Sequence, residues 1–292
     1  MSALERDLTY ALNPVALVRR CGLEADEWQA DVLRSEAKRI LLNCHRQSGK
    51  STVVAGRAIH RALYRPPWLA LIISPTERQS QETLLKGKTI AGAVGQDVDL
   101  GVDKDNELSL TFRNGSRIIA LPGKEKTIRA YSGVNELIVD EAARVPDRVY
   151  GTVRPMVAVS GGNIVLLSTP FGKRGFFHFE WIKGGDVWLR VLRPAAELEV
   201  LTAAERVRSV QPKLVRSLCP RIPLEFLEEE RARYPEWWFR QEYLCEFADT
   251  EDQAISYELV MGALGGPAPL QLTVPPEVRR EDLVGGVERL RL

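Results

Sequence analysis

The residues with the clearest capacity for chemistry form the short loop Arg46-Gln47-Ser48-Gly49-Lys50-Ser51-Thr52. It follows an apolar run at residues 39–44 and precedes a helical pattern that continues to Leu63. Backbone N–H groups at a helix start bind phosphate oxygens, a lysine there neutralises the β and γ phosphates, and the next hydroxyl ligates Mg²⁺. We predict phosphate contacts from the loop residues Gln47, Ser48, Gly49, Lys50, Ser51 and Thr52, and a metal contact from Ser51.

The loop departs from the full phosphate-binding pattern Gly-x-x-x-x-Gly-Lys-Ser/Thr, because Cys44 stands at the first glycine position. The alternative interpretation is an ordinary helix start with a solvated lysine. The preceding apolar run and the following helical pattern favour the phosphate-binding interpretation, since that is the context the loop requires.

A pair of carboxylates, Asp140 and Glu141, ends the apolar run 137–139. A carboxylate at this place can hold Mg²⁺ through water, and its neighbour can activate an attacking water. We assign the metal role to Asp140 and the general-base role to Glu141. The alternative is an N-cap and a first-turn acid of the next helix.

Three further polar residues are candidates with open alternatives. Thr169, in Ser168-Thr169-Pro170, ends another apolar run and could sense the γ phosphate, or belong to an ordinary turn. Arg46 could brace phosphates or hold Glu141. Arg129, in the loop before the acidic pair, could act as an arginine finger in its own subunit or a neighbouring one. For both arginines the alternative is a surface ion pair.

Gln29, upstream of the first apolar run, carries an amide that both donates and accepts hydrogen bonds, so it could read an adenine edge. Its alternative is a solvated helix residue. The loop, the acidic pair and Thr169 share one property, which is that each follows the carboxyl end of an expected strand. Ligands bind at such ends in parallel sheets.

The pattern along the chain predicts the elements that position these residues. Apolar runs at 39–44, 69–74, 136–139, 163–167 and 187–192 are typical of buried parallel strands, and helical patterns occupy 5–38, the stretch up to 63, and 77–90. Asn114-Gly115 predicts a hairpin between 108–112 and 117–121. This alternation predicts an α/β fold, with a mostly parallel sheet flanked by helices.

The pattern changes after Pro194, where residues 195–247 are expected to be all-helical. Glycines and prolines between 262 and 280 indicate a linker, and a short stretch follows. We therefore expect three parts: a phosphate-loop domain with an N-terminal helical segment at 1–194, a small helical subdomain at 195–250, and a third part at 251–292.

The composition is typical of a globular protein and disfavours a structural zinc site and a membrane-spanning segment. The 292 residues include 40 Lys and Arg against 39 Asp and Glu, a net charge of +1, and 45% hydrophobic residues, which is an ordinary globular balance. Four dispersed cysteines and three histidines disfavour a structural zinc site. The start of the chain does not resemble a signal peptide, and no apolar run is long enough to span a membrane, so we expect a cytosolic protein.

A nucleic-acid contact would need a local basic patch, because the net charge is near zero. Basic residues gather modestly at Lys86, Lys88, Lys124, Lys126, Arg206, Arg208, Lys213, Arg216 and Arg221. Such charges suit contacts with a phosphate backbone rather than sequence reading.

Four segments in this order resemble the ATPase part of the large terminase subunit of tailed phages and prophages: Trp28-Gln29, the loop 46–52, Ile138-Val139-Asp140-Glu141-Ala142, and Ser168-Thr169-Pro170. The stretch 241–247 resembles the segment that joins the two domains of that family. The resemblance implies a P-loop NTPase fold and an ATP- and Mg²⁺-dependent motor that moves double-stranded DNA through a portal protein into a procapsid. It also implies a homo-oligomeric ring, a small terminase partner, no membrane, and a place in the bacterial host cytoplasm.

The resemblance also implies roles for the candidate residues. Gln29 would lie near adenine, Lys50 and Ser51 on phosphate and Mg²⁺, Asp140 on Mg²⁺, and Glu141 would be the base. Thr169 would couple hydrolysis to movement, and Arg46 or Arg129 would be the arginine finger.

The chain departs from the family in its last part. The family carries a C-terminal nuclease with metal-binding aspartates, whereas here residues 283–288 resemble only its first strand, with Glu288 in place of the first aspartate. We therefore expect residues 251–292 to be a linker and a remnant of that domain, without DNA cleavage by this chain. Two other interpretations remain open, a helicase-like nucleic-acid-dependent ATPase, and an inactive prophage remnant that only binds nucleotide or partners.

Overall fold

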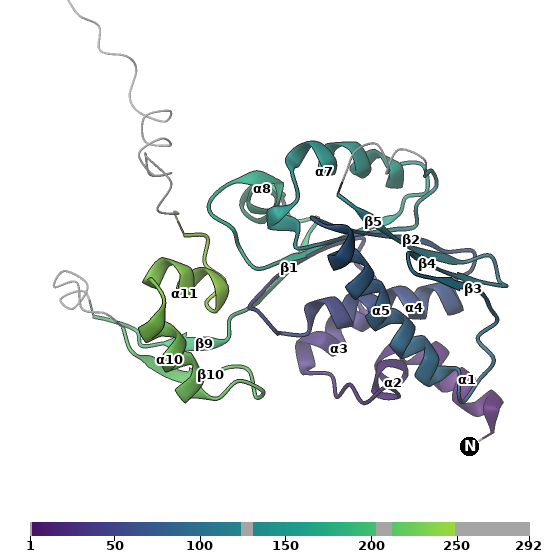
Figure 1. The fold of residues 1–292 in the computed structure, drawn as a ribbon, viewed down its shortest axis with the longest axis horizontal. Coiled ribbons are helices and arrows are strands. Elements are labelled where there is room, and N and C mark those ends of the chain that lie inside the picture. The colour runs from purple at the N-terminus through teal and green to yellow at the C-terminus, as the bar shows by residue number, and fades with distance from the viewer. Residues whose placement is uncertain (1, 124–130, 203–211, 249–292) are drawn as a thin grey trace, which may run out of the picture. The chain divides into compact units, whose positions relative to one another are not determined.

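The computed structural model describes residues 2–123, 131–202 and 212–248 (Figure 1). The chain divides into two compact units, residues 1–250 and 251–292. The expected linker and nuclease remnant therefore lie outside the described residues. In the described part, no helix combines the length and the apolar character needed to cross a membrane.

The core of the first unit is an eight-stranded sheet with the order β3-β4-β5-β2-β6-β7-β1-β8. Neighbouring strands from β5 to β8 in this order run parallel, and β4 and β3 are antiparallel additions at one edge. The strands are β1 Arg39–Cys44, β2 Leu69–Ser74, β3 Val102–Asn106, β4 Ser109–Phe112, β5 Arg117–Pro122, β6 Glu136–Asp140, β7 Asn163–Ser168 and β8 Leu189–Arg193. The predicted α/β class is thus confirmed.

Helices cover both faces of the sheet (Figure 1). Alternate residues of β1 show why its sequence is continuously apolar, since Ile40 and Leu42 enter one core and Leu41 the other. The first core is shared with α1 Ala3–Leu12, α2 Pro14–Arg19, α3 Glu27–Arg34, α4 Lys50–Tyr64 and α5 Glu77–Val94. The second is shared with η1 Ala142–Arg144, α7 Asp147–Val153, η2 Arg154–Val157 and α8 Gly175–Lys183.

The strand order brings three carboxyl ends together. β7 lies between β6 and β1, with Asn43 opposite Ser168 and Leu167 opposite Asp140. The loop after β1, the acidic pair after β6 and Thr169 after β7 therefore share one edge of the sheet. The predicted hairpin also forms between β4 and β5, where Gly115 adopts the positive φ of 86° that its turn requires.

The eight-stranded sheet contains a strand that was not predicted, and one prediction about a later segment is wrong. β3 was not expected, because its residues are all exposed and so carry no apolar pattern. Residues 195–248, which we name the C-terminal segment, are not all-helical, since β9 Ala196–Leu198 and β10 Leu214–Ser217 pair antiparallel beside α10 Leu224–Arg233 and α11 Glu236–Glu242. These strands are too short to show an alternating pattern, and their pairing partners lie far apart in the sequence. The segment has its own core around Leu227 and Phe239.

Candidate active site

The loop between β1 and α4 is shaped by Gly49, the N-cap residue of α4, which has a φ of 85°. A Cβ atom there would lie 2.8 Å from Nε2 of Gln29. The position therefore requires glycine for two reasons, its left-handed backbone and its contact with the neighbouring amide. The loop leads into a fifteen-residue helix whose first backbone N–H groups are available for an anion.

Gln29 is buried beneath this loop, with 1% of its surface exposed. Its Oε1 accepts a hydrogen bond from the Asp26 backbone N–H at 2.9 Å, and its Nε2 donates to the Ser48 carbonyl oxygen at 2.9 Å. The alternative of a solvated helix residue is wrong. The amide links the start of α3 to the phosphate loop, while a contact of Gln29 with adenine stays a prediction.

Lys50 and the acidic pair face each other at the sheet edge. Nζ of Lys50 lies 3.4 Å from Oε1 of Glu141, and the lysine side chain is only 7% exposed. Asp140 is buried and accepts hydrogen bonds from the Thr83 hydroxyl at 2.6 Å and the Glu141 backbone N–H at 2.9 Å. Burial, and then the Glu141 charge, raise the pKa of Asp140. The Ser51 side chain is close enough to Asp140 to oppose this rise of its pKa.

The donors Ser51 and Asp140 fit Mg²⁺. The described residues contain no group of three or more acidic, histidine or cysteine side chains able to hold a metal. Mg²⁺ does not need such a group, since it is commonly held by one or two protein oxygens together with phosphate and water. A buried carboxylate with a raised pKa also gains from a cation that favours its charged form.

Glu141 has an unusual backbone, with φ 51° and ψ 44° in the left-handed region. Such strain in a non-glycine residue costs about 1–3 kcal/mol and gathers at functional sites. Its Oε2 is held by Nη1 of Arg144 at 3.1 Å and by the Ser168 hydroxyl at 3.4 Å. Each oxygen of this carboxylate therefore meets a different cation, Lys50 on one side and Arg144 on the other.

Arg144 was not among the predicted site residues. Besides Glu141, it donates from Nη1 to the Thr169 hydroxyl at 3.0 Å and from Nη2 to Oε1 of Glu242 at 2.9 Å. Its spacing of three residues from Glu141 could have suggested the first contact. No local sequence signal indicates Glu242, which is 98 residues away.

Of the two predicted arginines, only Arg46 lies among the described residues. Arg46 does not hold Glu141, because its Nε lies 4.0 Å from Oε2 of Glu242, and Arg144 takes the predicted contact. Its side chain is 63% exposed. The C-terminal segment, rather than the acidic pair, lies beside this part of the loop. Arg129 lies outside the described residues. Gln47 has a φ of 60° at the exposed turn of the loop, and Thr52 is half-buried in the first turn of α4.

The C-terminal segment contacts the loop between β1 and α4. The Arg46 backbone N–H donates to the Glu242 carbonyl oxygen at 3.1 Å, and Arg221 pairs with Asp26 at 2.8 Å. Between the segment and the loop lies a pocket of about 390 Å³. It is lined by Asp26, Glu27, Trp28, His45, Arg193, Pro194, Leu218, Cys219, Pro220 and Arg221.

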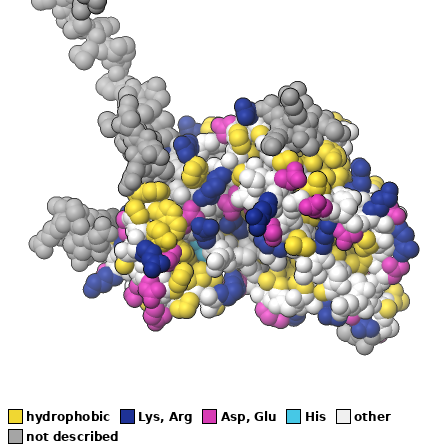
Figure 2. Space-filling view, in the orientation of Figure 1, with side chains coloured by type: hydrophobic (Ala, Val, Ile, Leu, Met, Phe, Trp, Pro, Cys, Tyr) yellow, Lys and Arg dark blue, Asp and Glu magenta, His cyan; other side chains and the backbone are white. Residues whose placement is uncertain are grey.

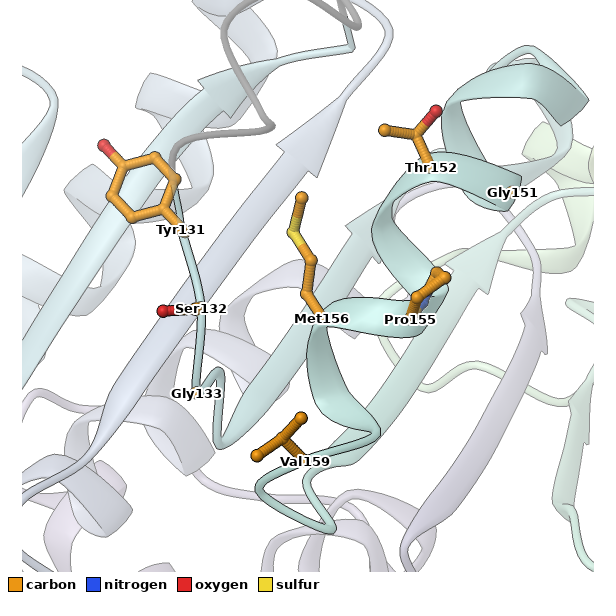
Figure 3. A pocket seen from close by; sticks show the side chains of 8 residues that line it. All are labelled: Tyr131, Ser132, Gly133, Gly151, Thr152, Pro155, Met156 and Val159. Carbon is orange, nitrogen blue, oxygen red and sulfur yellow. The ribbon is translucent and has the colours of Figure 1, made fainter.

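A larger pocket, of about 820 Å³, lies away from this site (Figure 3). Residues 131–133, which lead into β6, form one side, and Met156 and Val159 lie on the opposite side with the end of α7. This pocket is at the amino end of β6, whereas the acidic pair is at its carboxyl end. Size alone therefore does not identify the catalytic pocket here.

The basic cluster expected from the sequence does not form one unpaired surface. Lys88 pairs with Asp105, Arg216 with Glu197, and Arg221 with Asp26. The cluster members Lys124, Lys126, Arg206 and Arg208 lie outside the described residues. On the face seen in Figure 2, Lys and Arg side chains are interspersed with Asp and Glu.

His45 at the start of the loop gives a prediction about stability and pH. Burial lowers its pKa from 6.5 to about 4. Below pH 6.5 the unfolded chain binds a proton at His45, whereas the folded chain keeps His45 neutral until about pH 4. The free energy of unfolding therefore falls as the pH drops from 6.5 to about 4. His45→Gln is expected to flatten this fall, measured by urea unfolding across that range.

The other two histidines also make the free energy of unfolding fall at low pH, since burial lowers the pKa of His60 and His178 as well. The informative quantity is therefore the wild-type stability minus that of His45→Gln, taken at each pH. A difference that does not vary with pH would contradict the prediction.

Comparison with known proteins gives a consistent result. A family model described as "Terminase large subunit, T4likevirus-type, N-terminal" matches residues 42–260. The terminase large subunit of Thermus phage G20c is 25% identical over an alignment 261 residues long, which covers 80% of this chain and 51% of that protein. The chain thus spans about half the length of the curated relatives it matches.

Solved structures share the fold. The large terminase ATPase domain of Thermus phage P74-26 superposes with a TM-score of 0.59 at 21% identity, covering 80% of this chain and 97% of that one. The bacteriophage HK97 large terminase gives 0.61 at 15% identity, covering 81% and 55%. The family match covers well over half of the sequence and shows that the chain belongs to the family described as the N-terminal part of T4likevirus-type terminase large subunits.

Proposed function

We propose that this chain is the ATP-hydrolysing motor part of a viral DNA-packaging machine. The observation that carries the proposal is the convergence of three strand ends on one point. There Lys50 and Glu141 lie 3.4 Å apart, and Ser51 in the first turn of α4 is close enough to Asp140 to lower its pKa. A phosphate cradle, two oxygen donors for Mg²⁺ and a carboxylate base are the parts that nucleotide hydrolysis requires.

The proposed roles follow from the contacts. Lys50 and the backbone of residues 47–52 bind the phosphates, Ser51 and Asp140 hold Mg²⁺, and Glu141 accepts the proton of the attacking water. Mg²⁺ would supply charge neutralisation at the phosphates. The residues 1–194 would form the ATPase domain and 195–250 a subdomain that closes on it.

The base of the nucleotide would occupy the pocket of about 390 Å³ beside the loop. It offers an aromatic wall from Trp28 and His45 and the Arg221 guanidinium, which suit a flat heterocycle. Gln29 would support the site indirectly, because its hydrogen bond to the Ser48 carbonyl oxygen holds the loop in place. Thr169 would couple hydrolysis to movement, and Arg129 or Arg46 would complete the site as an arginine finger.

The wider assembly follows from the family. We propose double-stranded DNA, contacted through its backbone, as the track, with a portal protein and a small terminase subunit as partners. A homo-oligomeric ring would operate in the cytoplasm of the bacterial host. An arginine finger supplied by a neighbouring subunit would make turnover depend on ring formation.

The test is ATP hydrolysis by the purified chain with Mg²⁺, with and without double-stranded DNA, together with a strand-separation assay. Turnover that DNA stimulates without unwinding supports a packaging motor. Unwinding would instead favour a helicase-like ATPase. Nucleotide binding without turnover at any protein concentration would favour an inactive remnant.

Gly49→Ala is expected to weaken nucleotide binding by at least tenfold. The added Cβ would lie 2.8 Å from Nε2 of Gln29 and would displace the buried amide that hydrogen-bonds the loop at Ser48, and the left-handed backbone adds a cost of about 1–2 kcal/mol. Equilibrium titration with a fluorescent ATP analogue measures the effect.

Gly22→Ala is the matched control, because Gly22 has a φ of 83° and no atom within 4 Å of its added Cβ. It should lower stability through the same backbone strain and leave nucleotide affinity unchanged. Equal losses of affinity in both variants would contradict a specific role of the loop.

A further inference from the structure

The Arg144 side chain joins three parts of the molecule that are separate in sequence. Nη1 contacts Oε2 of Glu141 at 3.1 Å and the Thr169 hydroxyl at 3.0 Å, while Nη2 contacts Oε1 of Glu242 at 2.9 Å. The guanidinium also lies over the Phe171 ring, 4.9 Å from its centroid. The planar guanidinium makes these contacts from two nitrogens in fixed directions, whereas all the donors of a lysine lie on one nitrogen.

The three acceptors belong to the ends of β6 and β7 and to α11. Glu242 is the acceptor from the C-terminal segment, and its side chain is only 3% exposed. Its backbone carbonyl accepts from Arg46 in the phosphate loop, so this one residue contacts both the loop and Arg144. The position of α11 and the orientation of Arg144 are therefore linked by direct contact.

The two oxygens of Glu141 are held by different cations. Oε1 lies 3.4 Å from Lys50 Nζ, and Oε2 lies 3.1 Å from Arg144 Nη1. Phosphate binding would draw Lys50 away from Oε1, because the lysine is the phosphate ligand of the loop. Oε2 would stay held by Arg144, which leaves Oε1 available to accept a proton.

We propose that Arg144 is a positioning residue that orients Glu141 and Thr169 and makes that orientation depend on Glu242 of the C-terminal segment. This inference rests on the proposed ATPase function and adds a link between hydrolysis and the segment. A shift of α11 that separates Glu242 from Arg144 frees the guanidinium and disorients the base.

The arrangement favours a positioning role over a purely structural one. The Arg144 side chain is 31% exposed, so water can replace part of its contacts. When this side chain is removed, buried Glu242 keeps the Gln241 amide at 3.3 Å and Arg46 at 4.0 Å. Misorienting a catalytic group, in contrast, costs turnover steeply. Removing Arg144 should therefore reduce turnover much more than it reduces stability.

The test compares Arg144→Gln, Arg144→Lys, Glu242→Gln and the double variant Arg144→Gln/Glu242→Gln. Turnover should fall about 30-fold in Arg144→Gln and about tenfold in Glu242→Gln, with KM and the affinity for a fluorescent ATP analogue within about twofold of wild type. The double variant should lose no more than Arg144→Gln alone, because the pair acts as a unit. Arg144→Lys should recover less than a third of the lost activity, since a single nitrogen cannot take the places of both Nη1 and Nη2.

Arg240→Gln is the matched control. Arg240 also lies on α11 and pairs with a carboxylate, Glu246 at 2.7 Å, but it makes no contact with Glu141, Thr169 or Glu242 among the hydrogen bonds and ion pairs of the described residues. It should leave turnover unchanged. Additive losses in the double variant, full recovery by Arg144→Lys, a loss confined to KM, or an equal effect of Arg240→Gln would each overturn the proposal.

Urea unfolding without nucleotide supplies a readout that does not require turnover. The shift of the unfolding midpoint in Arg144→Gln/Glu242→Gln should be smaller than the two single shifts combined, as expected for residues in contact. If wild type hydrolyses no ATP, the proposed function fails while a non-additive midpoint shift still supports the link between Arg144 and Glu242. Additive midpoint shifts would overturn the link itself.

Discussion

Glu141→Gln is expected to reduce ATP turnover by about 10²–10⁴-fold, the range that a positioned general base contributes. The amide keeps the size of the carboxylate and its oxygen can still accept from Lys50 or from Arg144, but it cannot accept a proton from water. Nucleotide affinity should stay within about threefold of wild type, because the phosphate loop is untouched. Phosphate release at saturating ATP measures turnover, and equilibrium titration measures affinity.

Two comparisons sharpen this experiment. Lys50→Ala should lose affinity as well as turnover, since its ammonium is the phosphate ligand. Glu246→Gln removes a carboxylate whose partner is Arg240, outside the site, and should leave turnover unaltered. If Glu141→Gln retained more than a tenth of wild-type turnover, Glu141 would not be the base, and another group would have to be sought.

Glu136→Ala is expected to lower the free energy of unfolding by about 3–5 kcal/mol, the cost of leaving a buried charge unpaired. Glu136 begins β6 and is 0% exposed, and its Oε1 accepts from Nε of Arg57 on α4 at 2.9 Å. Arg57 is 1% exposed and Arg61 lies 4.0 Å from the same oxygen. The alanine variant would leave two guanidinium groups near an empty space in the core beneath the phosphate-loop helix.

Urea unfolding followed by circular dichroism measures the loss. The double variant Arg57→Met/Glu136→Leu should be more stable than Glu136→Ala, because apolar side chains of similar volume often replace a buried ion pair without loss. Arg113→Ala breaks an exposed pair with Asp99 and should cost far less stability than Glu136→Ala. Equal losses in Glu136→Ala and Arg113→Ala would show that burial of the first pair carries no special cost.

The sequence by itself determined where the chemical groups stand along the chain. Continuous apolar runs indicated the buried strands, because helices shield both faces of such a parallel sheet from water. Gly49, Lys50, Asp140 and Glu141 were found because each belongs to a short pattern that directly follows such a run. Local physical chemistry is enough for these features, since strand, loop and helix start are contiguous.

Tertiary structure alone decided how these groups meet. The place of β7 between β6 and β1, the contact of Thr83 with Asp140, and the contact of Arg144 with Glu242 all join residues that are distant in sequence. No local pattern encodes them, because a hydrogen bond between residues 98 apart depends on how the whole sheet and the C-terminal segment pack. The short strands β9 and β10 were missed for the same reason, since their pairing rather than their composition makes them strands.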